Sequence, residues 1–505
     1  MRRTPIVFAS LMMLVMAGAP AVADTATPGS LDTTFSIGAG PTSPTPPSAV
    51  QAIAVQPDGK VVVGGFFTKF NGLAVNGITR LTADGALDPS FNVGTGTVKG
   101  SVATVALQPD GKVLVGGFMT EFNGTPAHGI VRLNANGTVD NTFVQGTGFN
   151  DQVFDIEVQT DGKIMVAGAF TTYDGTPSPD VVRLLPTGAI DPTFASGRGV
   201  DAATGIDRIL VQADGKYMFF GSLRSYGDAT VNGIVRVNAD GTRDTTFNPG
   251  EGVGPNITDA VYSVIPQGDK YIVGGAFRTF NGQPRANLVR LTSTGAVDTT
   301  FGTANTSPNY QVNQVIAQAN GKLIAVGNFD KVGTKTNNGI VRLTKDAKID
   351  PTFVSGTGFN AAVTTQALQG DSKLLVGGFF SKYNSVAVNQ LVRLDASSLA
   401  TGTLLPQTGT LDLPAKVLKK GKTVLLKKAV VTNADQKASS KVTWSTKKSA
   451  KGTSSKYATV KTSAAGKVTI TTKGAVKKLY VKLTVNAPAD EFYSAYSATK
   501  KWTVK

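Results

Sequence analysis

Few residues of this 505-residue chain could carry catalysis. It contains one histidine, His128, no cysteine, and four glutamates. A Ser-His-Asp triad would depend on His128, and no nucleophile elbow accompanies it. Phosphate loops, zinc-ligand spacings and calcium loops are also missing from the sequence. We therefore expect no catalytic, cofactor or metal site, and a binding protein rather than an enzyme.

The alternative chemistry is sugar hydrolysis, which needs only two suitably placed carboxylates. The aspartates that lie outside any repeated pattern are the candidates for such a pair, although no two of them form a convincing pair in the sequence. They are Asp151, Asp155, Asp174, Asp180 and Asp228.

The remaining charged residues belong to a unit that recurs seven times, of which Ser101–Asp151 is one copy. Each unit has a hairpin such as Gln108-Pro109-Asp110-Gly111-Lys112, in which Asp bonds its own backbone and Gly takes the positive φ. We predict four strands in this copy. They are Val102–Leu107, Lys112–Gly117, Gly129–Leu133 and Val139–Phe143. Units of about 50 residues with four strands are typical of β-propeller blades, so we predict an all-β, seven-bladed propeller.

The third predicted strand of each unit contains an arginine. The fourth predicted strand of six units contains an aspartate, three residues before a phenylalanine. A three-residue loop at 135–137 sets Arg132 opposite Asp140. An aspartate that recurs in this way could indicate metal binding, but a feature repeated from blade to blade favours structure over a site. We interpret the pair as a structural strut between strands, with opposite charges facing each other.

The seventh unit lacks its fourth strand, because no Asp-x-x-Phe follows Arg393. The missing piece occurs near the N-terminus as Leu31-Asp32-Thr33-Thr34-Phe35. We therefore predict that the N-terminal strand completes the last blade and closes the ring, with Asp32 paired to Arg393.

The pattern QPDGK-VLVGGF, FNG and IVRLNANGTVDNTF resembles the bacterial delta-60 repeat family over residues 29–396. The resemblance implies a propeller fold and assigns no catalytic residues. Unit four departs most from the pattern, at 219–223 and 226–228, and unit six loses FNG at 331–333. We expect any binding function to lie where the units differ, in these loops and in the connections after each second strand.

The N-terminal segment has the features of a secretory signal peptide. Arg2 and Arg3 precede an apolar run that ends in a small-x-small site, so we predict a signal peptide over 1–23. The run is too short to span a membrane comfortably, and we expect no transmembrane segment in the mature chain. The protein is thus expected to be secreted, extracellular or associated with the cell wall.

The last hundred residues differ sharply in charge from the rest. They hold 21 of the 50 basic residues and four of the 34 acidic ones, which marks a boundary near residue 400. We predict a propeller over 24–399, a linker over 400–410 and an immunoglobulin-like sandwich over 411–505, which resembles bacterial surface modules. The segment Leu405–Gly409 matches a wall-sorting LPxTG motif, but no apolar tail follows it directly, so we interpret it as a chance match.

Lysine clusters in this basic region suggest contact with an anionic polymer of the cell envelope, or they serve only solubility. The residues of the first clusters are Lys419, Lys420, Lys422, Lys427 and Lys428. Nucleic acid is not an expected partner, because arginines and stacking aromatics are not interleaved with them.

Together these features predict a secreted or surface-associated binding or scaffold protein. Its propeller face would recognise a ligand or a surface protein, and its basic module would associate with the envelope. The alternatives are an extracellular polysaccharide hydrolase or lyase with its site in the propeller funnel, and a structural spacer that neither binds nor turns over a ligand. Nothing in the sequence fixes the oligomeric state.

Overall fold

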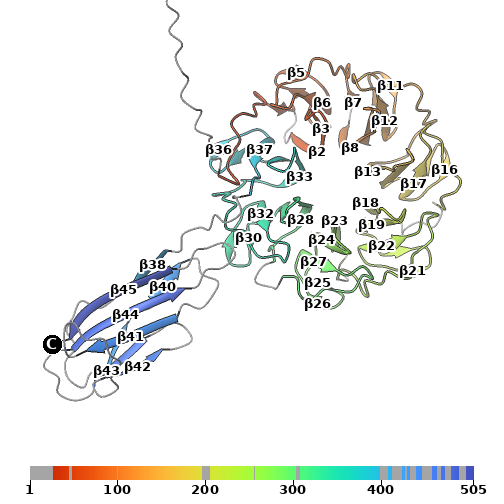
Figure 1. The fold of residues 1–505 in the computed structure, drawn as a ribbon. Coiled ribbons are helices and arrows are strands. Elements are labelled where there is room, and N and C mark those ends of the chain that lie inside the picture. The colour runs from red at the N-terminus through yellow and green to blue at the C-terminus, as the bar shows by residue number, and fades with distance from the viewer. Residues whose placement is uncertain are drawn as a thin grey trace, which may run out of the picture.

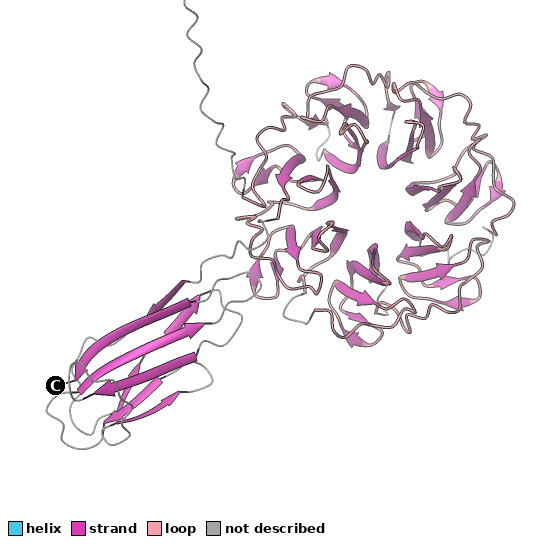
Figure 2. Ribbon diagram, in the orientation of Figure 1, coloured by secondary structure: helices cyan, strands magenta, loops and turns pink. Residues whose placement is uncertain are grey.

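The computed structural model describes residues 27–398, apart from 45–47, 99, 196–204, 255, 257 and 303–306, and the backbone of eight strands between residues 408 and 504. Seven small three-stranded sheets are arranged in a ring, so the first of these regions is a seven-bladed β-propeller (Figure 1). Strands are the regular elements throughout the described residues (Figure 2).

Each blade is a three-stranded antiparallel sheet with an inner, a middle and an outer strand. The inner strands line the channel and are β2 (Ala49–Val55), β8 (Ser101–Leu107), β13 (Val153–Val158), β18 (Ile206–Val211), β23 (Ala260–Gln267), β28 (Val312–Ala317) and β33 (Val363–Leu368). The middle strands are β3 (Val61–Phe66), β9 (Val113–Phe118), β14 (Ile164–Gly168), β19 (Tyr217–Gly221), β24 (Lys270–Ala276), β29 (Leu323–Gly327) and β34 (Lys373–Gly378). The outer strands are β6 (Ile78–Leu81), β12 (Ile130–Leu133), β17 (Val181–Leu184), β22 (Ile234–Val237), β27 (Leu288–Leu291), β32 (Ile340–Leu343) and β37 (Leu391–Asp395).

A two-residue hairpin follows the middle strand at the rim of each blade. These hairpins are β4–β5 (Lys69–Phe70, Leu73–Ala74), β10–β11 (Glu121–Phe122, Thr125–Pro126), β15–β16 (Thr172–Tyr173, Thr176–Pro177), β20–β21 (Ser225–Tyr226, Ala229–Thr230), β25–β26 (Thr279–Phe280, Gln283–Pro284), β30–β31 (Lys331–Val332, Lys335–Thr336) and β35–β36 (Lys382–Tyr383, Val386–Ala387). Two further short strands, β1 (Pro41–Thr42) and β7 (Thr97–Val98), pair with β4 and β10.

The core lies between neighbouring blades. On the middle strand β9, Val113 and Val115 pack in a cluster with Val62 of the preceding blade, whereas Leu114 packs with Ile164 of the following blade. All of these side chains are fully buried. Because both faces of a blade are covered, its middle strand is apolar at successive positions instead of alternating.

A β-bulge interrupts each inner strand, and it accounts for the glycine that recurs in the middle strand. In the second blade the register shifts between Val102 and Thr104. The backbone there comes so close that a Cβ atom on Gly117 would lie 2.1 Å from the Ser101 carbonyl oxygen. The bulge leaves one residue of each inner strand, Ala103 in this blade, outside the regular pairing.

The prediction of a fourth strand in each unit is wrong. Only one bridge, between Leu133 and Val139, extends the second blade beyond its outer strand. The chain then turns, because the Asp140 carboxylate accepts hydrogen bonds from the backbone and hydroxyl of Thr142, and the Phe143 amide donates to the Asp140 carbonyl. The phenylalanine therefore folds back into the core instead of continuing a strand.

The N-terminal segment closes the ring, as predicted. Leu31 forms a bridge with Leu394, and the Asp32 amide donates to the Arg393 carbonyl oxygen at 2.9 Å. The Asp395 amide donates to Ser30, also at 2.9 Å. The seventh blade is thus completed by residues more than 350 positions earlier in the chain. They pair with the edge of β37 that would otherwise be exposed.

Beyond residue 407 the structure describes strands only as backbone. They are β38 (Thr408–Leu411), β39 (Thr423–Leu426), β40 (Ala429–Thr432), β41 (Ser439–Ser445), β42 (Ala458–Thr462), β43 (Val468–Thr472), β44 (Leu479–Ala487) and β45 (Tyr496–Val504). They pair in three antiparallel sheets, β38–β40, β39–β43–β42 and β41–β44–β45. The described elements of this region are thus all β-strands, and the immunoglobulin-like topology stays a prediction. The signal peptide at 1–23, most of the linker and the lysine clusters lie outside the described residues.

Within the residues that are described, no helix is long and apolar enough to cross a membrane.

Candidate functional site

The recurrent arginines and aspartates meet in each blade. Arg132 Nε lies 2.8 Å from Asp140 Oδ2, and Arg393 Nε lies 2.8 Å from Asp32 Oδ2. Each arginine also stacks over the phenylalanine that follows its aspartate, with Arg132 4.8 Å from the ring centre of Phe143. These side chains are almost completely buried. The pairs are therefore part of the core of the blades.

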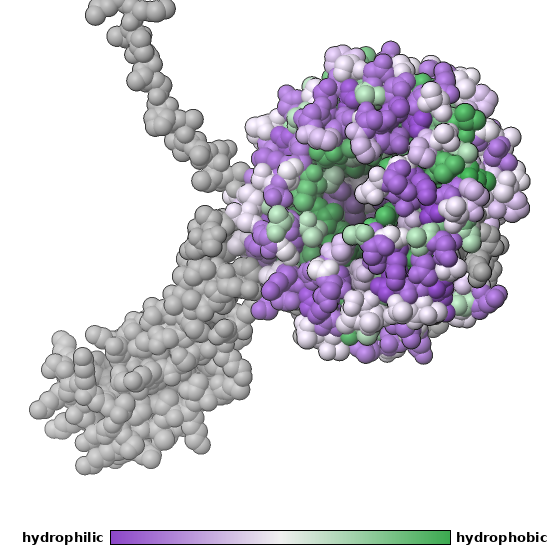
Figure 3. Space-filling model, turned by 45° about the vertical axis from the view of Figure 1, so that its right-hand side comes forward, coloured by the Kyte–Doolittle hydropathy of each residue, from purple (hydrophilic) through white to green (hydrophobic). Residues whose placement is uncertain are grey.

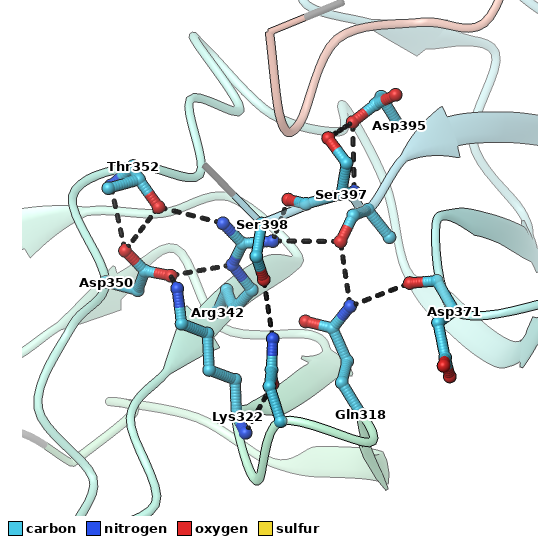
Figure 4. Close-up of polar contacts among 11 residues, drawn as sticks. Gln318, Lys322, Arg342, Asp350, Thr352, Asp371, Asp395, Ser397 and Ser398 are labelled. Carbon is cyan, nitrogen blue, oxygen red and sulfur yellow. Dashed lines mark hydrogen bonds and ion pairs between the residues drawn. The ribbon is translucent and has the colours of Figure 1, made fainter. Parts of the chain in front are cut away.

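Each strut also reaches neighbouring chain segments, as the sixth blade illustrates (Figure 4). Arg342 Nε contacts Asp350 at 2.8 Å, and its terminal nitrogen donates to the carbonyl oxygens of Ala396 and Ser397 in the seventh blade. Lys322 Nζ lies 2.8 Å from the same Asp350 carboxylate. The sequence interpretation missed this lysine, which is the last residue of the hairpin by which the units align.

Strut carboxylates are fully supplied with donors. Burial alone would raise the pKa of Asp140, but hydrogen bonds from Thr142 and the charge of Arg132 outweigh it and lower the pKa to about 2. The same balance holds the pKa of Asp350 below its usual value. A carboxylate with all its acceptor positions used has none left for a metal or ligand, and the struts therefore have a structural function.

The aspartates considered as hydrolase candidates do not converge. Asp151 and Asp228 are exposed, and Asp174 accepts a hydrogen bond from the Thr147 amide at a blade junction. Asp180 is buried with a positive φ of 60°. Asp155 alone faces the channel, where it lies with Glu157 among the lining residues. His128 is an exposed loop residue.

The channel is lined by the residues in which the blades differ. The bulge residue of each inner strand lies at the same place in every blade, yet its identity changes completely around the ring: Gln51, Ala103, Phe154, Asp207, Tyr262, Asn313 and Thr364. The residue after the middle-strand glycine varies as well: Phe66, Phe118, Ala169, Ser222, Ala276, Asn328 and Phe379. Since equivalent blades carry different residue types at these places, the fold does not fix their identity and their composition is available for function.

All seven bulge residues and two residues of the second set, Asn328 and Phe379, lie at one mouth of the channel and line a cavity of about 470 Å³. Its lining combines three aromatic rings with four side-chain amides, one aspartate and one arginine. The residues are Gln51, Ala103, Phe154, Asp207, Arg208, Tyr262, Gln311, Asn313, Asn328, Ala362, Thr364 and Phe379. We call this the mouth cavity. In the space-filling view the centre of the ring is hollowed, and hydrophobic side chains gather along its wall (Figure 3).

Hydrogen bonds fix several side chains of the mouth cavity. The Gln311 amide nitrogen donates to Asn313 Oδ1 at 2.8 Å, and the Asn313 amide nitrogen donates to the Val363 carbonyl oxygen at 2.7 Å. The Thr364 hydroxyl donates to the Val50 carbonyl oxygen at 2.8 Å. The polar wall is therefore pre-organised across the sixth, seventh and first blades, as a binding site requires.

The charged residues of the channel all come from the third and fourth blades. Arg208 donates to the Phe154 carbonyl oxygen at 2.8 Å and lies 3.5 Å from Asp155 Oδ1. Burial raises the pKa of Asp207 to about 6, although Arg208 opposes the shift. Burial and the charge of Asp155 together raise the pKa of Glu157 to about 8. Ionisation of these carboxylates therefore destabilises the native state, whereas ionisation of the strut carboxylates stabilises it.

Sequence reasoning missed Glu157, Asp207 and Arg208. A signal for the bulge residues was present, because each lies five residues before the glutamine of its hairpin or, in the fifth unit, before Gln267. Among the described residues, no group of three or more histidines, aspartates or glutamates is arranged to hold a metal ion.

The closed ring, the buried struts and the variable mouth define a seven-bladed β-propeller in which repeated blades surround a channel of irregular composition. Its repeats match the family described as "Domain of unknown function (DUF5122) beta-propeller", and the propeller consists of seven repeats of that family. The matched residues are 56–91, 108–143, 159–194, 212–247, 267–301, 318–353 and 369–398. The expected resemblance to the delta-60 type of propeller is supported at this level.

Two solved structures are similar in fold. One is a protein from Xanthomonas campestris described as a gluconolactonase important in glucose secondary metabolic pathways, with 12% identity, a TM-score of 0.32, and coverage of 69% of this chain and 86% of that one. The other is a "putative exported protein" from Bacteroides fragilis, with 10% identity, a TM-score of 0.27, and coverage of 57% and 80%. No curated protein matches the chain in sequence.

Proposed function

We propose that this chain is a secreted or surface-associated binding protein that takes its ligand in the mouth cavity. One observation carries the proposal. The residues that build the blades repeat seven times, whereas the bulge residues around the cavity differ in every blade, and the cavity lining combines aromatic with hydrogen-bonding groups. Binding sites have this composition, with an apolar lining and a few placed polar groups.

The test uses the intact mature chain immobilised as bait for components of a cell-envelope extract. Phe379→Ala removes an aromatic wall of the mouth cavity, and Phe118→Ala removes the equivalent residue of the second blade, which does not line the cavity. We expect capture to fall about tenfold with the first substitution and to stay unchanged with the second. Equal capture by both variants contradicts binding in the mouth cavity.

The basic C-terminal region is proposed to hold the protein near an anionic envelope polymer. Its excess of lysine supports an electrostatic attraction that weakens as salt is added. The variant to test replaces five lysines with glutamine in the full chain, at 419, 420, 422, 427 and 428. We expect it to be released from isolated envelopes at lower salt than the parent chain, and identical salt dependence contradicts the proposal.

One observation favours a second candidate function, hydrolysis of an extracellular polysaccharide. Glu157 lines the channel and Asp207 lines the mouth cavity, and Arg208 lines both. Burial raises the pKa of Glu157 to about 8 and that of Asp207 to about 6. Two carboxyl groups with separated pKa values are the arrangement that supplies an acid and a base. Turnover of a polysaccharide by the purified chain that Glu157→Gln abolishes supports this function, and binding without turnover excludes it.

A further inference from the structure

The chemistry of the mouth cavity also indicates the class of its ligand. Phe154, Tyr262 and Phe379 provide flat apolar faces, and Phe379 is 36% exposed. Aromatic faces of this kind pack against the C–H face of a sugar ring as they pack against other apolar surfaces. An aromatic wall by itself would equally suit an apolar side chain of a protein, so the polar wall decides the class.

The polar wall consists mainly of side-chain amides, which both donate and accept hydrogen bonds, as hydroxyl groups do. Gln311 uses its amide nitrogen on Asn313, which leaves the Gln311 carbonyl oxygen as an acceptor. Asn328 is exposed and makes no side-chain hydrogen bond within the described part of the chain. Asp207 adds a carboxylate, which accepts from the hydroxyls of a polyol. This set suits a ligand covered with hydroxyl groups and poorly suits an apolar one.

The charge of the cavity further restricts the ligand. Arg208 is its one cation, and that guanidinium already donates to the Phe154 carbonyl oxygen and contacts Asp155. Asp207 places a negative charge in the same wall. An anionic sugar or a phosphate would therefore meet the Asp207 carboxylate, and it would have to share Arg208 with the Phe154 carbonyl oxygen and Asp155. The volume of about 470 Å³ lies within the range of roughly 300–1,000 Å³ that small-molecule sites occupy.

We infer that the mouth cavity binds an uncharged saccharide, with a sugar ring against Phe379 and the neighbouring aromatic residues and its hydroxyls held by Gln311, Asn328 and Asp207. This inference rests on the proposed function of the cavity and adds the ligand class. It also separates the two ends of the molecule. The propeller selects a neutral sugar, whereas the lysine-rich region attracts an anionic polymer.

The experiment measures binding of the full mature chain to neutral and acidic oligosaccharides by calorimetry. The neutral probes are oligomers of glucose, galactose, mannose and N-acetylglucosamine, and the acidic probe is oligogalacturonate. We expect a neutral probe to bind with a Kd of about 1 mM or tighter. Phe379→Ala and Asn328→Ala should each weaken this binding about tenfold, whereas Phe118→Ala should change it less than about twofold.

The outcomes distinguish failure of the inference from failure of the proposed function. If no neutral probe binds, the neutral-saccharide inference is overturned, and the capture experiment with Phe379→Ala decides separately whether the mouth cavity is a binding site. If oligogalacturonate binds more tightly and Phe379→Ala weakens that binding, the inference is overturned while the mouth cavity remains a binding site. If a neutral probe binds equally to the parent chain, Phe379→Ala and Asn328→Ala, both statements fail. Circular dichroism of each variant checks that the propeller stays folded, which the exposure of Phe379 and Asn328 leads us to expect.

Discussion

Asp140 in a strut and Asp207 at the mouth cavity are both carboxylates beside an arginine, but the protein treats them in opposite ways. Asp140 receives hydrogen bonds from Thr142 and Arg132, and its pKa falls to about 2. Asp207 lies beside an arginine that is committed elsewhere, and burial raises its pKa to about 6. The hydrogen-bonding groups of the repeated residues are thus paired within the fold, whereas some hydrogen-bonding groups of the variable residues are left to bind a ligand.

The largest effect expected from this comparison is the loss of a strut. Arg342→Leu removes a fully buried cation from the fully buried Asp350 carboxylate, which keeps only the partly exposed Lys322 as a cationic partner. Removing one partner of such a pair costs about 3–5 kcal/mol, so we expect the free energy of unfolding to fall by that amount in urea titrations. Asn328→Ala, at the mouth cavity of the same blade, should change it by less than about 0.5 kcal/mol. Similar losses in the two variants would break the comparison.

A second test compares two struts of different connectivity. Asp140 bonds an arginine eight residues away, whereas Asp32 bonds Arg393 across the closure of the ring. We expect Asp140→Asn and Asp32→Asn each to cost about 1.5–3 kcal/mol, the range for hydrogen bonds to charged groups. Only Asp32→Asn should also speed amide hydrogen exchange in β37, because the closing segment then opens locally. Equal protection of β37 in both variants would contradict a special role for the closing strut.

The third test uses pH, because protonation of the channel carboxylates and protonation of the strut carboxylates change the free energy of unfolding in opposite directions. Glu157 has a native pKa of about 8 against an ordinary value of 4.5, so the native state binds the extra proton between these values. The free energy of unfolding should therefore decrease as the pH rises from about 5 to 8, by on the order of 2 kcal/mol, and Glu157→Gln should remove the part of this decrease above about pH 6.

Strut carboxylates contribute the reverse slope at lower pH. Asp140, with a pKa of about 2 against 3.8, stabilises the native state above its unfolded pKa, and this stability is lost as the pH falls from about 4 to 2. Denaturation measured from pH 3 to pH 9 should accordingly show a maximum near pH 5. A stability that rises steadily up to pH 8 would show that Glu157 is not buried as described.

Much of the fold was predictable because it is repeated. The spacing of the hairpins predicts seven blades, and the absent motif after Arg393 predicts closure by Leu31–Phe35. The fourth strand was wrongly predicted, since alternation over Val139–Phe143 gives no sign that Asp140 would bend the chain through its own side chain. The local sequence pattern indicates which neighbouring strands pair. A side chain that accepts a hydrogen bond from a nearby backbone amide can end a strand that this pattern would continue.

The mouth cavity was predictable only in outline. The expectation that function lies in the connections after each second strand covers Asn328 and Phe379, but the bulge residues lie in the first strands, which it did not name. A repeat alignment also does not show which variable positions converge. Asp207 and Asn328 are more than a hundred residues apart and reach one cavity only through the closed ring. Glu157 carried no sign of its altered pKa, because that shift arises from burial and from Asp155 in the assembled channel.

The smallest expected effect provides the sharpest comparison, because it applies one substitution to both regions. Asp207→Asn removes a charge whose ionisation burial makes costly, so at pH 8 we expect the free energy of unfolding to increase by up to about 1 kcal/mol. Asp140→Asn lowers it under the same conditions. The gain should disappear as the pH falls from about 6 to 4, where native Asp207 is already protonated.

Loss of ligand binding should accompany this gain in stability, as expected of a residue kept for function at a cost to the fold. The neutral saccharide that the parent chain binds should bind Asp207→Asn more weakly at pH 8, since an amide replaces the acceptor carboxylate. Asp207→Glu serves as the control that keeps the charge and should show no gain in stability. If Asp207→Asn instead destabilised the propeller as much as Asp140→Asn, Asp207 would belong with the struts, and the division between repeated framework and variable site would not hold for this blade.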